Sequence, residues 1–186
     1  MHVTESSAVM SIVGNENRYG LIAQGLHWVT ALLVLSAWLI AGTWQHNANG
    51  AMLLTLHQTL GFAVFVLVLV RLAWRQVDRR PEEPPMPSLM ALAAQASHWL
   101  LYGLLVAIPL TAIVGSWLEG HAITIYGFGA IGPWLAESRR LGHQILEVHE
   151  VLGTMLIWIA GLHAAAALFH HFFLKDRVLR QMLPVG

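Results

Sequence analysis

The stretch 145–174, which reads ILEVHEVLGTMLIWIAGLHAAAALFHHFFL, decides the fold of this chain. It runs for about thirty residues with almost no charge. At about 1.5 Å per residue, a helix of this length is more than long enough to cross a hydrocarbon core of about 30 Å. Four histidines lie in the stretch: His149, His163, His170 and His171. Because histidine in a membrane span costs free energy, it usually marks a functional position.

The spacing of two of these histidines indicates sites at two depths. His149 and His163 are 14 residues apart, which is close to four helical turns. We therefore expect their rings on nearly the same face of the helix, about 21 Å apart along its axis. One helix face that presents two imidazoles at two depths suits a membrane protein that holds two haems stacked across the bilayer.

The composition places the chain among integral membrane proteins. Hydrophobic residues make up 56% of the 186 residues and charged residues only 11%, whereas soluble domains carry about 25% charged residues. The formal net charge is zero, so charge gives no indication of nucleic-acid binding. The absence of cysteine excludes disulfides, c-type haem attachment and thiolate-held iron–sulfur clusters. Residues 1–20 lack an apolar core and are not expected to be a cleavable signal peptide.

The hydrophobic pattern predicts an all-α fold, a four-helix transmembrane bundle. The linker 75–88 is rich in proline and charge and cannot continue a helix in hydrocarbon. The loop 119–144 has an apolar, glycine-rich centre, and we expect it to lie along the membrane surface or dip into the bundle. The predicted order is a disordered or loosely helical tail (1–20), a di-haem domain (21–175) with spans at about 25–44, 52–74, 93–118 and 145–174, and a basic tail (176–186).

The Lys and Arg residues predict the orientation. Two of the ten, Arg139 and Arg140, fall on one side of the predicted spans. The other eight fall on the opposite side: Arg18, Arg71, Arg75, Arg79, Arg80, Lys175, Arg177 and Arg180. The positive-inside rule therefore predicts that both termini are cytoplasmic.

With this orientation, four histidines can be paired by depth. His57 and His149 each lie four or five residues from the outer end of their span, which predicts an outer pair. His27 and His163 lie about 25 and 27 Å below the outer ends of their spans, which predicts an inner pair. A single intramembrane histidine can simply hydrogen-bond a neighbouring backbone, but four depth-matched histidines on three spans favour ligands.

Three further histidines are weaker candidates. His98 lies about 30 Å below the outer end of the third span and competes for the inner site, but it fits less well than His163. His170 shares the face of His163 but lies about 10 Å further inward, which suits a haem edge, a quinone contact or the interface. For His98, His170 and His171, a role as snorkelling or interfacial residues is favoured. Four histidines are expected in solvent: His2, His46, His121 and His143.

A pair of imidazoles at each depth suits haem better than zinc, which prefers four protein ligands, or three with a water. Two imidazoles fill both axial positions of a haem iron, which then carries electrons rather than binding oxygen. Arg71 and Arg75, at the inner end of the second span, are candidates to pair with inner haem propionates. Their alternative role, as positive-inside anchors, is at least as well supported.

Several motifs resemble the prokaryotic cytochrome b561 proteins, which are four-helix, di-haem b proteins of the bacterial inner membrane. The motifs are GLHW at 25–28, HQTLG at 57–61, HWLLY at 98–102, HEVLG at 149–153 and GLHAAAALFHHFFLKDRVLRQMLP at 161–184. The resemblance implies His27, His57, His149 and His163 as axial ligands of two haems b. It also implies ubiquinone as an electron partner and, in some members, superoxide as a donor. The loop 119–144 matches no motif of the family.

Two functional classes remain open. The first is an oxidoreductase that moves electrons between an outer-face donor and ubiquinone within the membrane lipid. The second is a cytochrome b membrane-anchor subunit that passes electrons between a partner dehydrogenase or hydrogenase and quinone. The short loops favour the first. Arg139 and Arg140 would attract a small anion such as superoxide, or they form an ordinary charge cluster balanced by Glu137 and Glu147. No catalytic residue can be assigned.

Overall fold

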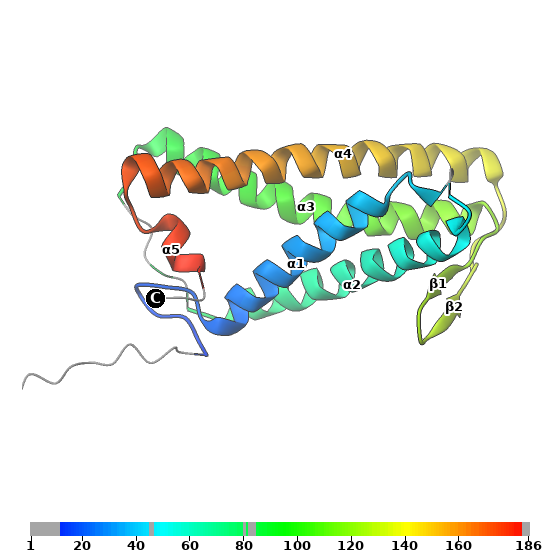
Figure 1. Cartoon of the computed structure of the whole chain (residues 1–186), viewed down its shortest axis with the longest axis horizontal. Helices are drawn as coiled ribbons and strands as arrows, with labels where there is room; N and C mark the ends of the chain where they lie inside the picture. Colours follow the sequence, from blue (N-terminus) through cyan, green and yellow to red (C-terminus); the bar gives the residue numbers. More distant parts are fainter. Residues whose placement is uncertain (1–11, 45–46, 80, 82–84, 184–186) are drawn as a thin grey trace, which may run out of the picture.

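The structure is a computed structural model that describes residues 12–44, 47–79, 81 and 85–183. The predictions for His2, His46 and Arg80 fall outside these residues. The elements in chain order are α1 (Leu21–Ile40), α2 (Gly50–Val77), α3 (Ser88–Leu118), β1 (Ile123–Ile125), β2 (Gly129–Ile131), α4 (Arg139–Phe169), the π-helical turn η2 (His170–Leu174) and α5 (Val178–Met182) (Figure 1).

Four helices in the described part of the chain are long and apolar enough to cross a membrane, and the predicted four-helix fold is confirmed. Their bounds differ from the predicted spans. α1 ends at Ile40 rather than near Trp44, because the chain turns at Gly42, which has a φ of 77°. α4 begins at Arg139, six residues before the predicted span. α3 runs through Pro109 without ending.

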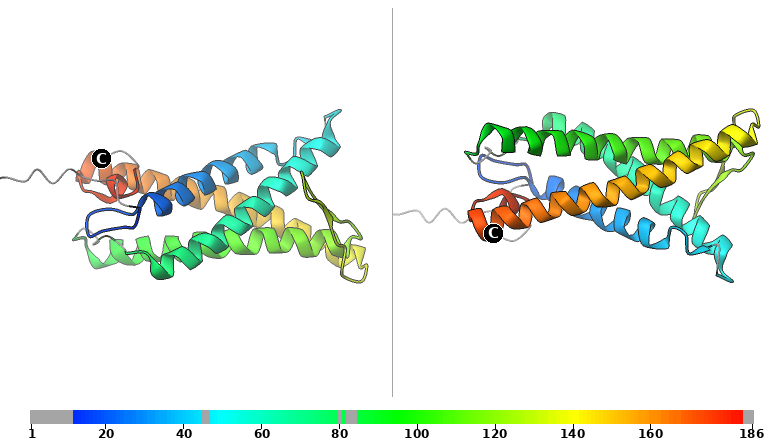
Figure 2. Two further views of the ribbon diagram at one scale, coloured as in Figure 1. Left: turned by 90° about the horizontal axis from the view of Figure 1, so that it is seen from below. Right: turned by 90° about the horizontal axis from the view of Figure 1, so that it is seen from above.

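The four long helices form two pairs. α1 packs chiefly on α2, and α3 packs chiefly on α4, whereas direct contacts between the two pairs are sparse. One end of the bundle, called here the terminal end, holds residues 12–20 and α5 (Figure 1). The other end, called the hairpin end, holds β1 and β2, and the two pairs separate toward it (Figure 2). This arrangement leaves side chains of α4 to face those of α1 and α2 without close packing of the backbones.

A small apolar core joins the pairs at mid-height. It contains Val64 and Val68 of α2, Leu104 and Leu105 of α3, and Leu156 of α4. Leu156 is seven residues from both His149 and His163, which is close to two helical turns in each direction. The core therefore forms an apolar layer midway between the levels of the two histidines.

Residues 12–20, which belong to the predicted tail 1–20, are joined by hydrogen bonds to other segments at the terminal end. The Gly14 N–H donates to Asp78 Oδ1 at 2.9 Å, and the Tyr19 N–H donates to the Gln181 carbonyl at 3.2 Å. The buried Gln24 side chain donates to the carbonyls of both Tyr19 and Gln181. These bonds hold the predicted basic tail, which contains α5, against the start of α1.

The loop 119–144 contains a β-hairpin, which the all-helical prediction missed. β1 and β2 form an antiparallel hairpin in which Ile123 pairs with Ile131 and Ile125 pairs with Gly129. Ile123 and Ile125 are buried, because β1 contacts both α2 and α3. The hairpin therefore contributes to the packing at its end of the bundle.

Candidate functional site

The best-defined candidate site is formed by His57 of α2 and His149 of α4, which depth-matching predicted as a pair. Their ring centres are 6.2 Å apart and the ring planes are almost perpendicular, at 82°. The Nδ1 atoms of His57 and His149 lie 2.9 Å from the carbonyl oxygens of Ala37 and Ile108, respectively. A carbonyl oxygen only accepts, so each Nδ1 carries the proton and each Nε2 keeps its lone pair.

This geometry fits a pair of axial ligands. Histidine ligands commonly donate their second ring nitrogen to a carbonyl or carboxylate, which fixes the tautomer and the ring orientation. Two imidazoles bound at about 2 Å on opposite sides of one metal ion have ring centres about 6 Å apart. The ring of Trp44 lies 5.1 Å from that of His57 and packs against it from the α1 side. The His57–His149 pair is therefore arranged as a haem iron would require.

A second group of histidines lies nearer the terminal end. The rings of His163 and His98 are 5.5 Å apart. His27 lies within electrostatic range of both, and of Arg71. The Nδ1 atom of His27 is buried and has no hydrogen-bond partner among the described residues. The structure thus adds His98 to the level at which the sequence placed His27 and His163.

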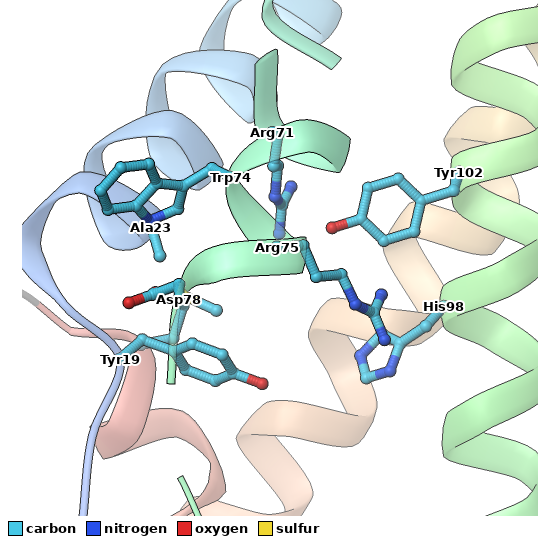
Figure 3. A pocket seen from close by; sticks show the side chains of 9 residues that line it. Tyr19, Ala23, Arg71, Trp74, Arg75, Asp78, His98 and Tyr102 are labelled. Carbon is cyan, nitrogen blue, oxygen red and sulfur yellow. The ribbon is translucent and has the colours of Figure 1, made fainter. Parts of the chain in front are cut away.

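A cavity of about 90 Å³ opens beside this second group at the terminal end (Figure 3). Arg71 and Arg75 point into it from α2, and both guanidinium carbons lie 5.4 Å from the ring centre of Tyr102. Trp74 also lines the cavity, and its Nε1 is buried without a partner in the described part of the chain. The remaining lining residues are Tyr19, Ala23, Asp78, His98 and Met182.

Two guanidinium groups and an unpartnered N–H donor make this cavity suited to a carboxylate or another anionic group. No carboxylate of the described residues forms an ion pair with Arg71 or Arg75. Sequence reasoning found the two arginines from their place at the helix end but missed Trp74 and Tyr102. A tryptophan next to a charged helix end looks like an interfacial anchor, and only the packed structure shows its N–H to be enclosed.

His170 is separate from both histidine groups. Its Nδ1 is hydrogen-bonded to the Asp176 carboxylate just beyond η2, and Asp176 also accepts from the Val178 N–H. Burial alone would raise the pKa of Asp176, but these hydrogen bonds, chiefly that from His170, hold it below its usual value. His171 packs edge-on against Phe172. The His170–Asp176 contact ties the end of α4 to the start of α5.

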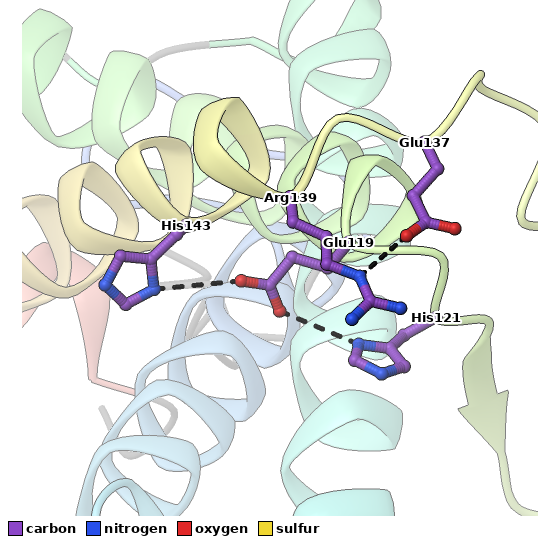
Figure 4. A network of polar contacts seen from close by, with 5 residues as sticks. All are labelled: Glu119, His121, Glu137, Arg139 and His143. Atoms are coloured by element: carbon purple, nitrogen blue, oxygen red, sulfur yellow. Dashed lines mark hydrogen bonds and ion pairs between the residues drawn. The ribbon is translucent and has the colours of Figure 1, made fainter.

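The hairpin end carries an exposed polar network (Figure 4). Glu119 lies between His121 and His143, at 3.6 and 3.7 Å, and both histidine side chains are highly exposed, as their predicted solvent positions require. Arg139 is paired with Glu137 at 2.6 Å. Arg140 forms no ion pair with any residue that the structure describes, so its charge is not neutralised locally.

Glu147 lies 3.6 Å from His143 rather than next to an arginine. Among the residues described, no three or more His, Asp or Glu side chains gather in a way that could hold a bare metal ion. A haem iron needs only two protein ligands, because its macrocycle supplies the others. The His57–His149 pair therefore suits a haem iron better than a bare metal ion.

Comparison with known proteins agrees with this chemistry. The sequence pattern of the prokaryotic cytochrome b561 family matches residues 18–185. The chain belongs to this family. It is 30% identical to cytochrome b561 homolog 2 of Escherichia coli K12, over 94% of this chain and 95% of the relative. It is also 30% identical to the probable superoxide oxidase CybB of Yersinia pestis, over 90% and 96%.

A third relative is cytochrome b562 of Cereibacter sphaeroides, 30% identical over 85% of this chain and 90% of the relative. Membership of the cytochrome b561 family implies that this chain binds haem b. Four apolar helices and relatives named as cytochromes make it a multi-pass membrane cytochrome that functions in electron transfer.

Proposed function

We propose that this cytochrome b561 protein is an oxidoreductase of the bacterial inner membrane that holds two haems b and passes electrons from superoxide to ubiquinone. The terminal end faces the cytoplasm. This orientation is supported by the seven Lys and Arg residues of the described chain that lie beside the terminal ends of the helices, against two at the hairpin end. The hairpin end then forms the outer face.

His57 and His149 are the axial ligands of the outer haem in this proposal. The observation that carries it is the pair of Nδ1–carbonyl hydrogen bonds, which leaves both Nε2 atoms available across a 6.2 Å separation of the rings. The two residues come from different helix pairs, between which direct contacts are sparse. A flat macrocycle can therefore lie between α2 and α4 without displacing a packed interface.

His27 and His163 are the proposed ligands of the inner haem. His98 lies nearer to His163 than any other histidine ring for which a contact is found, but α3 and α4 pack directly against each other. A macrocycle between His98 and His163 would have to separate that interface. His27 belongs to α1, across the sparsely packed side of α4, and its buried Nδ1 lacks a partner among the described residues.

The cavity at the terminal end is the proposed place of the inner haem propionates. Ala23 of its lining is one turn from His27, and His98 of its lining lies at the level of His27 and His163. Arg71 and Arg75 bind carboxylates through charge-assisted hydrogen bonds, which are about twice as strong as neutral ones. The Arg71 and Arg75 side chains thus orient the propionates, and His98 lies at the edge of the same space.

When bound with two histidines, a haem b carries one electron at a time and leaves no axial position for oxygen. Two superoxide anions give up one electron each and become dioxygen. Ubiquinone takes up these two electrons with two protons from the cytoplasmic side and becomes ubiquinol. His170 is the proposed quinone contact at that side, because Asp176 holds its Nδ1 and leaves its Nε2 to face a carbonyl oxygen.

Superoxide as the donor is supported by the relative named probable superoxide oxidase in Yersinia pestis. It is also supported by Arg140, which has no ion-pair partner in the described structure and lies at the start of α4. Arg139 contributes less, because Glu137 neutralises it. A positive charge beside the outer site raises the local concentration of a small anion.

The experiment is a haem count with a functional assay on one preparation. A pyridine haemochrome assay of the purified chain is expected to give two haems b per chain, with a low-spin reduced spectrum. In proteoliposomes that contain ubiquinone, externally generated superoxide is expected to reduce quinone, and superoxide dismutase should abolish this reduction. One haem per chain would overturn the ligand assignment. Reduction only after a dehydrogenase or hydrogenase is added would favour the membrane-anchor subunit instead.

A further inference from the structure

The hairpin of β1 and β2 is anchored to the side of α2 by polar side chains. Gln58 Oε1 accepts a hydrogen bond from the Thr124 N–H at 3.0 Å, and Thr59 Oγ1 accepts one from the Tyr126 N–H at 3.1 Å. The Tyr126 hydroxyl donates to the Met52 carbonyl at 3.3 Å. Gln58 and Thr59 thus accept hydrogen bonds from two backbone N–H groups of the hairpin that do not bond to the opposite strand.

The depth of these anchors is unusual for a loop. Thr59 is nine residues from the start of α2 at Gly50, which places it about 13 Å from the hairpin end of the helix. From Arg75, near the other end of α2, Thr59 is 16 residues away, or about 24 Å. A hydrocarbon core is about 30 Å thick, so Thr59 lies within it even when the far boundary is placed at Arg75. Any tilt of α2 shortens the distance from Arg75 to Thr59 along the membrane normal. Thr59 then lies further from the opposite boundary of the hydrocarbon core.

We propose that residues 123–131 are a re-entrant β-hairpin, which turns back from the hairpin end of the bundle into the membrane beside α2. Non-helical backbone is tolerated at membrane depth only where its polar groups are satisfied by protein or water. The side chains of Gln58 and Thr59 meet this requirement for the N–H groups of Thr124 and Tyr126, on the side of the hairpin that faces α2. This accounts for Gln58 and Thr59, two polar residues inside the apolar stretch of α2 that bind no other helix in the described part of the chain.

The two sides of the hairpin differ in exposure, as expected for a hairpin with protein on one side and lipid on the other. Ile123 and Ile125 are each only 5% exposed and face the protein, whereas Phe128 at the turn is 87% exposed. Gly127 in the turn and Gly129 at the start of β2 have φ angles of 80° and 90°, which suit glycine. In Figure 1 the turn projects sideways past α2 and back along the bundle, away from the loop that follows.

The occupant of the space around Phe128 is membrane lipid. A fully apolar side chain at a turn that lies beside the apolar stretch of a spanning helix is suited to contact with acyl chains, whereas the neighbouring Tyr126 is of the type enriched at membrane interfaces. Tyr126 is half exposed next to Phe128 and bonds its hydroxyl to Met52, toward the membrane surface. A polar hairpin in water would gain nothing from exposing Phe128.

The natural absence of cysteine makes a direct test possible. Phe128→Cys is labelled with the environment-sensitive dye NBD and reconstituted in vesicles of phosphatidylcholine, with or without doxyl-labelled lipid. The matched control is Glu137→Cys, on an exposed residue of the same loop that the proposal leaves in water. Label at position 128 is expected to emit at shorter wavelength and to be quenched severalfold more by doxyl lipid than label at position 137.

Two other outcomes would each rule out contact between the turn at Phe128 and lipid. Water-like emission at position 128 with no quenching by doxyl lipid would show that the hairpin lies outside the membrane. Emission at short wavelength without quenching would show that protein, for example a second copy of the chain, covers the turn. Because Phe128→Cys could disturb the turn, Ala130→Cys on β2 is labelled in parallel, and both variants must keep the visible spectrum of the parent protein.

Discussion

Replacing His149 with glycine removes one proposed haem ligand and leaves the rest of α4 in place. In the structure the His149 ring is 6.2 Å from that of His57, and His163 is 14 residues further along the helix, about 21 Å away. The apolar layer around Leu156 lies between the two levels. The loss of a ligand at one level should therefore leave the other site intact, and the haem content should fall from two per chain to one.

The assay is the reduced-minus-oxidised spectrum, normalised to protein concentration, together with the pyridine haemochrome count. The amplitude of the haem b band is expected to fall to about half of that of the wild type. Added imidazole should restore part of the lost band in His149→Gly, because a free imidazole can occupy the space that the ring leaves. His143→Gly is the matched control, since this exposed residue lies on the same helix and should keep both haems.

The same measurement tests the inner ligands. His27→Ala and His163→Ala should each remove the inner haem and spare the outer one. His98→Ala should retain both haems, although the rings of His98 and His163 are 5.5 Å apart. If His98→Ala removes a haem as completely as His163→Ala does, and His27→Ala does not, the reasoning that places the macrocycle between the helix pairs is refuted.

Three further predictions concern the two ends of the molecule. Arg140→Glu changes the charge by two units about 13 Å from His149, which should slow reduction by superoxide about twofold at low ionic strength and hardly at physiological salt; stopped-flow reduction, with a neutral quinol as the comparison, measures this. Asp176→Asn should destabilise the protein at neutral pH, because the folded-state pKa of Asp176 lies below its usual value of 3.8. The difference between the unfolding temperatures of variant and wild type should vanish as the pH falls through the folded-state pKa. Thr59→Val should weaken the hairpin by about 1 kcal/mol and accelerate amide exchange at Tyr126 about fivefold, whereas Thr55→Val, which loses only a bond within α2, should not.

The helices and the outer histidine pair could be predicted from the sequence because both follow from the fixed rise of a helix. Long apolar runs leave a membrane chain little alternative to helix, and counting residues from the helix ends placed His57 level with His149. The same count favoured His163 over His98 only narrowly. Their predicted depths differ by about 3 Å, or two residues, which is smaller than the error in the predicted ends of the spans.

The hairpin and the cavity could not be predicted because they depend on contacts between distant segments. A three-residue strand carries no periodic signal, and the hairpin is fixed by Gln58 and Thr59, more than sixty residues earlier in the chain. In the sequence, Gln58 and Thr59 look like polar interruptions of an apolar span. Only the structure shows that they bind the hairpin. Trp74 is similar, because its enclosed N–H follows from how Tyr19 and α5 close the terminal end.

The sparse packing between the two helix pairs is consistent with the proposed ligand positions. α4 carries a histidine at both levels on one face, and that face is turned toward α1 and α2, with which α4 shares few direct contacts. If apolar side chains packed closely between α4 and the α1–α2 pair, there would be no room for two macrocycles between them. Within the described residues, the core between the pairs is instead one layer, from Val64 to Leu156, at the height where neither haem is expected. The sparse packing is thus what the proposed di-haem arrangement requires, since two cofactors would complete the interface between the helix pairs.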